Sequence, residues 1–319
     1  MARRDDKVVF IHGGLPGETV TISTFAKKPS FELANVVEIV EPSAQRVIPK
    51  CRYFGICGGC SVQHLDSNAQ VAVKQRVLED ALARLGKVKP ETMLPAIYGE
   101  PWRYRTRARL GVRYVEKKGG VLVGFHERKS SFIADMESCE ILPASVSSLL
   151  RPLRDLLNQL SIRNRIPQIE VAVTEDSTAL SLRILEPLTD DDQALLRNFG
   201  RKHGVDLYVQ PGGPESVHPM NGGETLKYSL AEFGVTLTFG PADFTQVNPA
   251  INRVLVRRAI ALLDPRPGES IADFFCGIGN FSLPLARRGA MVTGFEGNST
   301  LITRARENAK RNGLAENTR

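Results

Sequence analysis

The chain has 319 residues and a mass of 35.1 kDa, enough for two domains or three small ones. Its hydrophobic share of 42% and charged share of 24% are ordinary for a soluble globular protein. No apolar run approaches the roughly 18 residues that span a bilayer, and the apolar stretch at residues 8–11 is too short for a secretory signal. We therefore expect a cytoplasmic protein that does not associate with a membrane.

Basic residues outnumber acidic ones by 42 to 35, and the whole excess lies in one window. Residues 101–130 contain nine Lys and Arg but only two Glu, so this window has a net charge of +7 and the rest of the chain is neutral. A single basic stripe on a neutral body favours a polyanion, such as a nucleic acid, bound at one place.

Short strands are predicted near the N-terminus. Residues 8–11 form an apolar run, and apolar side chains alternate with polar ones at 20–24 and 31–39. The pairs Gly13-Gly14 and Pro16-Gly17 mark turns between them. The pattern is typical of a small barrel of antiparallel strands, to which we assign residues 1–50.

Four of the five cysteines form a candidate metal site. Cys51, Cys57 and Cys60 fall within ten residues, and Cys139 lies far downstream. In a cytosolic chain such a cluster is more often a metal site than a set of disulfides. Four thiolates suit a [4Fe–4S] cluster or an all-cysteine zinc site, and a trio with one remote residue favours the cluster. The alternative is four ordinary buried thiols.

The segment after the cysteine loop predicts one clear helix and one clear hairpin. Apolar spacing indicates a helix over residues 67–85, with Gly86 as its C-terminal cap. Residues 102–114 alternate as a strand does, and Gly119-Gly120 turns the chain into a second strand at 121–125. We assign residues 51–234 to a central α+β domain that contains the cysteines and this hairpin.

Arginines occupy one face of the strand at 102–114, because side chains alternate along a strand. A guanidinium offers a planar fork to phosphates and stacks on bases. The alternative is a solvated strand face, but a row of arginines with almost no acidic neighbours favours nucleic acid. The candidate RNA-binding residues are Arg103, Arg105, Arg107, Arg109 and Arg113.

From residue 235 onward the pattern changes to alternating helices and strands. The predicted elements are a helix opened by Asn248-Pro249, a buried strand at 270–275, a helix at 281–288, a strand at 291–295 and a helix at 298–312. This order predicts the first half of a doubly wound parallel sheet. The fold class is therefore α/β, with residues 235–319 as an incomplete Rossmann-like domain.

A glycine loop between the strand at 270–275 and the next helix is the candidate cofactor site. Gly277 and Gly279 let the backbone approach a ligand, and Glu296 ends the following strand, where an acid receives ribose hydroxyls. Position 282 is Ser, so the three-glycine fingerprint of dinucleotide sites fails. S-adenosylmethionine, which has no pyrophosphate, suits the loop better. The alternative is a plain tight turn.

Three segments closely resemble the RNA uracil-C5 methyltransferases. They are Cys51-Arg-Tyr-Phe-Gly-Ile-Cys-Gly-Gly-Cys60, Asp243-Phe-Thr-Gln-Val-Asn248 and Asp273-Phe-Phe-Cys-Gly-Ile-Gly-Asn-Phe281, and the arginine-rich strand fits as well. Residues 8–42 look like the TRAM module, a small OB-like RNA-binding barrel. TRAM, cluster and methyltransferase domain together resemble the branch that methylates 23S ribosomal RNA, whereas the tRNA-specific relatives lack the first two.

The resemblance implies roles for individual residues. The [4Fe–4S] ligands match Cys51, Cys57, Cys60 and Cys139, and the S-adenosylmethionine contacts match Gln246, Phe275, Asn280 and Glu296. In this family a thiolate adds to carbon 6 of uracil, carbon 5 takes the methyl group, and a base then removes its proton. The family's catalytic cysteine and base lie beyond residue 319, so we expect this chain to be inactive alone. We interpret Cys276 as a packing residue.

Two hypotheses of different class stay open. In the first, the chain belongs to a monomeric 23S ribosomal RNA methyltransferase that uses S-adenosylmethionine and a [4Fe–4S] cluster. In the second, it is a non-catalytic RNA-binding iron–sulfur protein. Transfer of a labelled methyl group from S-adenosylmethionine to RNA distinguishes them.

Overall fold

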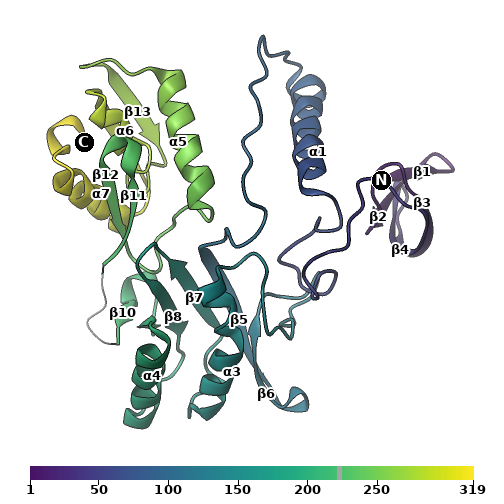
Figure 1. Ribbon diagram of the computed structural model, residues 1–319, viewed down its shortest axis with the longest axis horizontal. Coiled ribbons are helices and arrows are strands. Elements are labelled where there is room, and N and C mark those ends of the chain that lie inside the picture. The colour runs from purple at the N-terminus through teal and green to yellow at the C-terminus, as the bar shows by residue number, and fades with distance from the viewer. Residues whose placement is uncertain (221–224) are drawn as a thin grey trace. The chain divides into compact units, whose positions relative to one another are not determined.

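The computed structural model describes residues 1–220 and 225–319, and these form two compact units (Figure 1). The first unit contains residues 1–55 and 60–96, and the second contains residues 56–59 and 97–319. Among the described residues, no helix is both long and apolar enough to cross a membrane.

A four-stranded sheet forms the N-terminal part of the first unit. Its order is β1-β2-β4-β3, with the bounds Ala2–Arg4 (β1), Lys7–His12 (β2), Thr19–Lys27 (β3) and Phe31–Glu41 (β4). The three predicted strands are confirmed, and β1 was not predicted. The expectation of a wholly antiparallel sheet is wrong, because β4 pairs with β3 as a hairpin on one edge and with β2 in parallel on the other.

One long helix completes the first unit. It runs as α1 over Ser67–Asp80 and continues as a π-helical turn, η1, over Ala81–Gly86. The side chain of Asp66 caps its start by accepting the amides of Asn68 and Ala69. The predicted helix is confirmed, but Gly86 is not the cap: the wider last turn moves the left-handed position to Lys87, whose φ is 52°.

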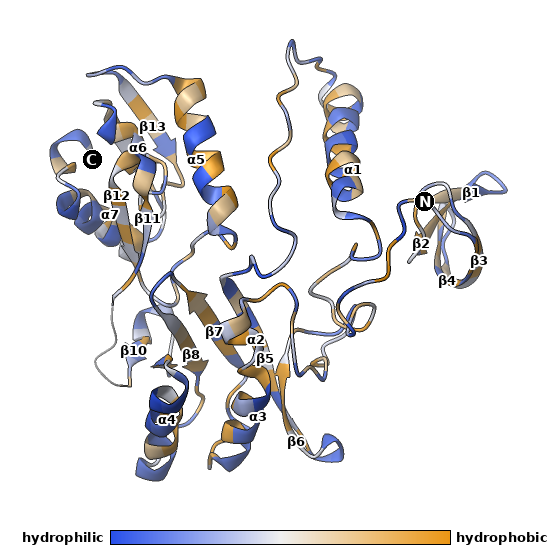
Figure 2. Cartoon of the chain, in the orientation of Figure 1, coloured by the Kyte–Doolittle hydropathy of each residue, from blue (hydrophilic) through white to orange (hydrophobic). Residues whose placement is uncertain are grey.

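A six-stranded sheet forms the centre of the second unit, with the order β10-β9-β8-β7-β5-β6. The strands are β5 (Arg107–Val115), β6 (Gly120–Gly124), β7 (Gln168–Val173), β8 (Thr178–Arg183), β9 (Asp206–Gln210) and β10 (His218–Pro219). They are largely apolar (Figure 2), and β8 and β9 form the one parallel pair of this sheet among the described residues. The accompanying helices are α2 (Ala144–Ser147), α3 (Leu150–Gln159) and α4 (Asp190–His203).

The predicted strand at 102–114 starts late in the structure. Strand β5 begins at Arg107, because Arg103 has a φ of 59° and its amide donates to the carbonyl oxygen of Glu140 instead of to a strand. The hairpin itself is confirmed: a 3-10 turn, η2 (Glu116–Lys118), and Gly119 connect β5 to β6.

The C-terminal part of the second unit follows the predicted order. A hairpin of β11 (Leu226–Leu230) and β12 (Val235–Phe239) precedes α5 (Pro249–Leu263), β13 (Ser270–Phe274), α6 (Ser282–Arg287), β14 (Met291–Phe295) and α7 (Ser299–Arg311). Short 3-10 turns are η3 (Pro214–Ser216), η4 (Ala231–Phe233) and η5 (Ala315–Asn317). Strands β13 and β14 pair in parallel, as predicted for a doubly wound sheet.

An apolar core holds these C-terminal elements together. It contains buried side chains of the β11–β12 hairpin, of α5 and of α6, among them Leu226, Leu237, Phe239, Val256, Ile260 and Leu283. The expectation that β13 is a buried strand is wrong, since only every second side chain turns toward this core and Phe274 is 66% exposed.

Candidate functional site

The glycine loop that follows β13 has a strained and well-anchored backbone. Phe275 has a φ of 64°, a left-handed conformation that costs free energy for a side chain of this size, and Gly277 and Gly279 also have positive φ. The amides of Phe275 and Cys276 both donate to the carbonyl oxygen of Phe295, at 2.7 and 3.1 Å. This turn leaves the Phe275 ring 89% exposed beside the end of β14.

Glu296 holds the glycine loop from the next strand end. Its Oε2 accepts the amide of Gly277 at 3.2 Å, and its Oε1 accepts the amide of Asn298 at 3.0 Å. Asn298 in turn caps α7 through its side chain. Because a carboxylate oxygen has two acceptor sites, each oxygen of Glu296 keeps one for a further donor such as a ribose hydroxyl.

Asn280 is bound within the protein rather than turned toward solvent. Its side chain and that of Asn252 exchange two hydrogen bonds, of 2.9 and 3.0 Å, and the Tyr228 hydroxyl donates to the same Asn280 oxygen at 2.8 Å. Burial raises the pKa of Tyr228 well above its ordinary value, so the hydroxyl stays a neutral donor. The three side chains therefore tie the glycine loop to α5 and β11.

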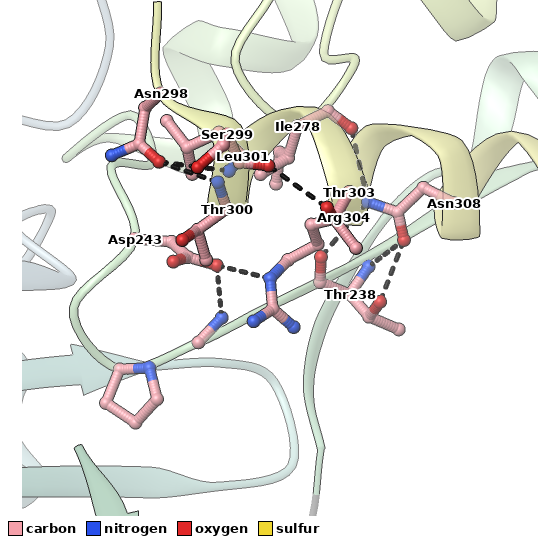
Figure 3. A network of polar contacts seen from close by, with 12 residues as sticks. Thr238, Asp243, Ile278, Asn298, Ser299, Thr300, Leu301, Thr303, Arg304 and Asn308 are labelled. Carbon is pink, nitrogen blue, oxygen red and sulfur yellow. Dashed lines mark hydrogen bonds and ion pairs between the residues drawn. The ribbon is translucent and has the colours of Figure 1, made fainter. Parts of the chain in front are cut away.

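Gln246 lies on a separate loop, residues 240–248, which connects β12 to α5. Its side chain is exposed, and the loop around it is anchored by Asp243 (Figure 3). The Asp243 carboxylate accepts the amide of Gly240 at 2.6 Å and forms an ion pair with Nε of Arg304, on α7, at 2.6 Å. Phe244, next in the chain, is exposed.

A single buried amide links β12, α7 and the glycine loop (Figure 3). Oδ1 of Asn308 accepts the backbone amide and the hydroxyl of Thr238, at 2.9 and 2.8 Å. Its Nδ2 donates to the carbonyl oxygens of Thr238 and Ile278, at 3.1 and 3.2 Å. Every donor and acceptor of this fully buried side chain is satisfied, as burial of a polar group requires.

Cys276 lies on the glycine loop between two carboxylates. Burial, together with the negative charges of Asp273 and Glu296, raises the pKa of its thiol. Asp273 is half-buried, and its partial removal from water raises the pKa of its carboxyl, which accepts the Ser282 hydroxyl at 2.6 Å. Because the thiolate is the nucleophile, a thiol kept protonated in this way is poorly suited to covalent catalysis.

Two of the five predicted RNA-binding arginines donate hydrogen bonds to carbonyl oxygens of the protein, although the side chain of Arg103 is still 41% exposed. Nη1 of Arg103 donates to the carbonyl oxygens of Cys139 and Leu142, at 2.9 and 3.3 Å. Arg107 is largely buried, and its Nη2 donates to backbone carbonyl oxygens of loop 240–248. These two guanidiniums are engaged in local structure.

The other three arginines differ in their exposure. The side chain of Arg109 is 69% exposed although it forms an ion pair with Glu170 at 2.9 Å, and Arg113 is exposed near the hairpin tip. Arg105 is half-buried, and its backbone amide donates to the carbonyl oxygen of Ile141. Arg109, Arg113 and part of Arg103 are therefore accessible to a phosphate, whereas Arg105 and Arg107 are less exposed.

The four predicted cluster ligands are divided between the two units. Cys51 and Cys60 belong to the first unit, and Cys57 and Cys139, both buried, belong to the second. All five cysteines are among the described residues, and none of them forms a disulfide. Within that same part of the chain, no group of three or more His, Cys, Asp or Glu side chains is arranged to hold a metal ion.

The loop around Cys57 is built for close backbone approach. Cys57 forms an isolated β-bridge with Glu127, and the amide of Gly58 donates to the carbonyl oxygen of His126 at 2.8 Å. A Cβ at position 58 would lie 3.0 Å from that oxygen, so any larger residue there would push against the backbone of His126. The amide of Gly59 lies 3.4 Å from the Cys57 sulfur. Thiols outside disulfides, with an amide directed at one sulfur, fit the chemistry of iron–sulfur ligation.

The sequence analysis missed the residues that hold the loops in place, above all Tyr228, Asn252, Arg304 and Asn308. One signal was available for the two asparagines, because Asn is disfavoured inside helices unless its side chain has a partner. Their partners lie 28 and 70 residues away in the sequence, so only the fold identifies them.

Comparisons with known proteins agree with this arrangement. Residues 66–318 match the family described as tRNA (Uracil-5-)-methyltransferase. The chain is 60% identical, over its whole length and 73% of the relative's, to the 23S rRNA (uracil(1939)-C(5))-methyltransferase RlmD of Nitrosospira multiformis. It is 59% identical to RlmD of Ralstonia nicotianae, over 97% of this chain and 69% of the relative.

A solved structure shares the fold. The Pyrococcus abyssi tRNA (uracil-54, C5)-methyltransferase, in complex with S-adenosyl-L-homocysteine, superposes with a TM-score of 0.72 over 98% of this chain and 74% of that one. The two sequences are 20% identical, so the likeness shows a common mixed α/β methyltransferase fold.

Proposed function

The chain belongs to the tRNA (uracil-5-)-methyltransferase family, and from this premise we propose that it acts in the S-adenosylmethionine-dependent methylation of carbon 5 of a uracil in 23S ribosomal RNA. The observation that carries the proposal is the 60% identity to RlmD of Nitrosospira multiformis over the whole chain. The relatives are named for uracil 1939, and the equivalent uridine is the proposed target. A ribosomal substrate places the protein in the cytoplasm.

The proposed cofactor contacts come from three loops of the second unit. Glu296 accepts the ribose hydroxyls with the acceptor sites left free by Gly277 and Asn298, and the exposed Phe275 ring offers an apolar surface. Gln246 contributes from loop 240–248, and Asn280 contributes through the loop backbone that its side chain fixes. When bound, S-adenosylmethionine supplies an electrophilic methyl group on its sulfonium.

The reaction at uracil needs a thiolate, since carbon 5 becomes nucleophilic only after a thiolate adds to carbon 6. Cys276 does not take this role in our proposal. Burial and two neighbouring carboxylates keep its thiol protonated, and its sulfur lies against the backbone of β14, where a Cβ at Gly294 would approach it to 2.8 Å. Its role is packing between the glycine loop and β14.

The proposed [4Fe–4S] cluster is held by Cys51, Cys57, Cys60 and Cys139. Support comes from the donor chemistry of four thiols outside disulfides and from the Gly59 amide directed at the Cys57 sulfur. We propose a structural role for this cluster, since its ligands come from two distant segments of the chain. A bound cluster would add covalent links to a loop that backbone hydrogen bonds already hold.

RNA binding is proposed for two surfaces. One is the exposed part of the arginine row, Arg109 and Arg113, which present guanidiniums to solvent from β5. The other is the N-terminal sheet of β1–β4, which we propose to be a TRAM-like module within residues 1–50. We leave Arg103 and Arg107 out of this proposed RNA-binding surface, because their guanidiniums already donate to carbonyl oxygens of the protein.

The test is methyl transfer in vitro with labelled S-adenosylmethionine. The purified full-length gene product is incubated with 23S ribosomal RNA from a strain that lacks the gene, and in parallel with unmodified tRNA. Label in 5-methyluridine of the 23S RNA alone is the expected result. Label in tRNA alone would overturn the ribosomal substrate, and no label in either RNA would favour a non-catalytic RNA-binding protein.

A further inference from the structure

Arg107 has a different environment from the other arginines of β5. It precedes Arg109 by two residues and therefore starts from the same face of the strand, yet its guanidinium is largely buried. Its Nη2 donates to the carbonyl oxygens of Pro241 and Asp243, at 2.7 and 2.5 Å. The same guanidinium lies 5.7 Å from the ring centre of Phe239, the last residue of β12. Arg107 thus contacts both the strand end and the first turn of loop 240–248.

The backbone beside Arg107 binds the far end of the same loop. The amide and the hydroxyl of Thr106 donate to the carbonyl oxygen of Val247, at 2.9 and 3.3 Å. The amide of Val173, at the end of β7, donates to the carbonyl oxygen of Thr106 at 2.9 Å. Loop 240–248 is therefore attached near both ends to the central sheet, and Gln246 lies between the two attachments.

The loop has few other restraints. Its Asp243 carboxylate binds Arg304 of α7 (Figure 3) and the amide of Gly240, which fixes the side chain. The carbonyl oxygen of Asp243 accepts a hydrogen bond from Arg107. The loop forms neither a helix nor a strand, and Phe244 and Gln246 are exposed. Fixing each residue of such a segment has a conformational-entropy cost that anchoring contacts must offset.

We propose that Arg107 is a positioning residue for the methyl-donor site: it holds loop 240–248 in the conformation that presents Gln246 to the cofactor, and it does not bind RNA phosphate. The proposal rests on the proposed function of that loop. The arginines of β5 then have two separate tasks, since Arg107 serves the cofactor loop of the same unit and Arg109 and Arg113 face the RNA. A guanidinium suits the first task because its terminal Nη2 carries two N–H donors, one for each of the two carbonyl oxygens.

The test measures the affinity for S-adenosylhomocysteine by calorimetry, without RNA and below the unfolding transition. Arg107→Met loses both hydrogen bonds and should weaken binding roughly tenfold or more, as for hydrogen bonds from a charged group. Arg107→Lys keeps the charge but not the fork and should show a smaller loss. The matched control, Arg109→Met, removes an exposed guanidinium on the same face and should leave this affinity unchanged while weakening RNA binding.

The contrary results are equally distinct. Wild-type affinity in Arg107→Met, or an equal loss in Arg109→Met, would overturn the proposal. If Arg107 only stabilised the fold, Arg107→Met would lower the unfolding temperature without changing the affinity of the folded protein for S-adenosylhomocysteine. If Arg107→Met does not fold, Arg107→Lys is used in its place. Unchanged affinity of Arg107→Lys for S-adenosylhomocysteine would then contradict the role of Arg107.

A further variant, Gln246→Ala, separates this proposal from the assignment of the cofactor site. Loss of affinity in Gln246→Ala but not in the Arg107 variants would leave the site in place and refute the role of Arg107. Unchanged affinity in Gln246→Ala, with a loss in Arg107→Met, would support positioning by Arg107 and show that another residue of the loop makes the contact.

Discussion

At the scale of single residues, burial and the charges around Cys276 raise the pKa of its thiol and disfavour a role as nucleophile. Its sulfur lies on the loop that is proposed to bind the cofactor, which is a position that invites assignment as a nucleophile. The structure surrounds it with Asp273 and Glu296, and both burial and these charges raise the pKa of the thiol. A catalytic cysteine requires the opposite environment, with nearby positive charge or a helix N-terminus that stabilises the thiolate.

We predict that Cys276→Ser retains methyl transfer in the intact enzyme. Serine has nearly the same volume and can keep the contact with the backbone of β14, but it cannot act as a thiolate. Methyl transfer to 23S RNA, measured as initial rate, should fall by no more than a few-fold. A loss of several orders of magnitude, as for removal of a covalent nucleophile, would contradict our interpretation and make Cys276 catalytic.

Glu18 is a second residue whose surroundings determine its protonation. Its carboxylate accepts hydrogen bonds from the Arg46 guanidinium, from the amide of Leu15 at 2.7 Å and from the amide of Ser43 at 3.2 Å. The hydrogen bond from Arg46 is the largest cause that lowers the pKa of Glu18 from 4.5 to about 2. Glu18 thereby joins the turn before β3 to the segment after β4.

The lowered pKa predicts a specific acid response of the first unit. A carboxyl whose pKa is lower in the folded state than in the unfolded chain stabilises the folded state at any pH above its unfolded pKa. This stabilisation is lost as the pH falls from about 4.5 toward 2. The unfolding temperature of the wild type should therefore fall as the pH is lowered from 6 to 3. Glu18→Gln should have a lower unfolding temperature at pH 6, and its unfolding temperature should depend less on pH over this range. Identical pH profiles for the two proteins would contradict the role of Glu18.

At the scale of elements, local hydrogen bonding made several boundaries predictable. Asn248 caps α5 by accepting the amide of Ile251 at 3.1 Å, and Pro249 occupies the first helical position, as the Asn-Pro pair indicated. Such caps depend on residues that are neighbours in the sequence. Strand β5 shows the opposite case, because its late start depends on the contact of Arg103 with Glu140, which the alternating pattern does not contain.

The burial of side chains on β5 could be predicted from the sequence only in part. Alternation predicted correctly that Ala108 and Leu110 turn into the core and that Arg109 turns out. It could not show that loop 240–248 covers Arg107, since the loop and the strand are more than 130 residues apart. The position of Glu296 at a strand end was predicted from the parallel-sheet pattern, whereas its hydrogen bond to Gly277 required the fold.

The exposed arginines of β5 are predicted to contribute to RNA binding and to its dependence on salt. If Arg109 and Arg113 each contact an RNA phosphate, the double variant Arg109→Met/Arg113→Met should bind RNA more weakly and with a shallower dependence on salt. The slope of log affinity against log salt should decrease by about 0.7 to 0.9 for each lost contact. Titrations at several salt concentrations measure it, and a slope equal to that of the wild type would indicate that these arginines form a solvated face.

At the scale of the whole molecule, the proposed cluster ligands come from segments that are far apart in the sequence. Residues 56–59 belong to the second unit, although the residues on both sides belong to the first. The glycines of this segment allow the close backbone approach to His126, and Cys57 lies within it. A cluster ligated by Cys51, Cys57, Cys60 and Cys139 would link the 51–60 loop to a residue far along the chain, and we propose that its task is structural.

We predict that anaerobically purified protein is brown and contains about four iron atoms and four acid-labile sulfides per chain. Cys139→Ala should lose iron and lower the unfolding temperature, because Cys139 is buried and the only proposed ligand outside the 51–60 loop. Cys276→Ala is the matched control and should keep the full iron content. Stoichiometric zinc without iron in the wild-type protein would contradict the cluster and indicate an all-cysteine zinc site.

Methylation of one base in ribosomal RNA is tested most directly on the RNA of the organism itself. Mass spectrometry of 23S ribosomal RNA fragments from a strain with the gene disrupted should show loss of a single 5-methyluridine, at the uridine equivalent to 1939, and reintroduction of the intact gene should restore it. Unchanged methylation of that uridine, or loss of 5-methyluridine from tRNA instead, would contradict the account.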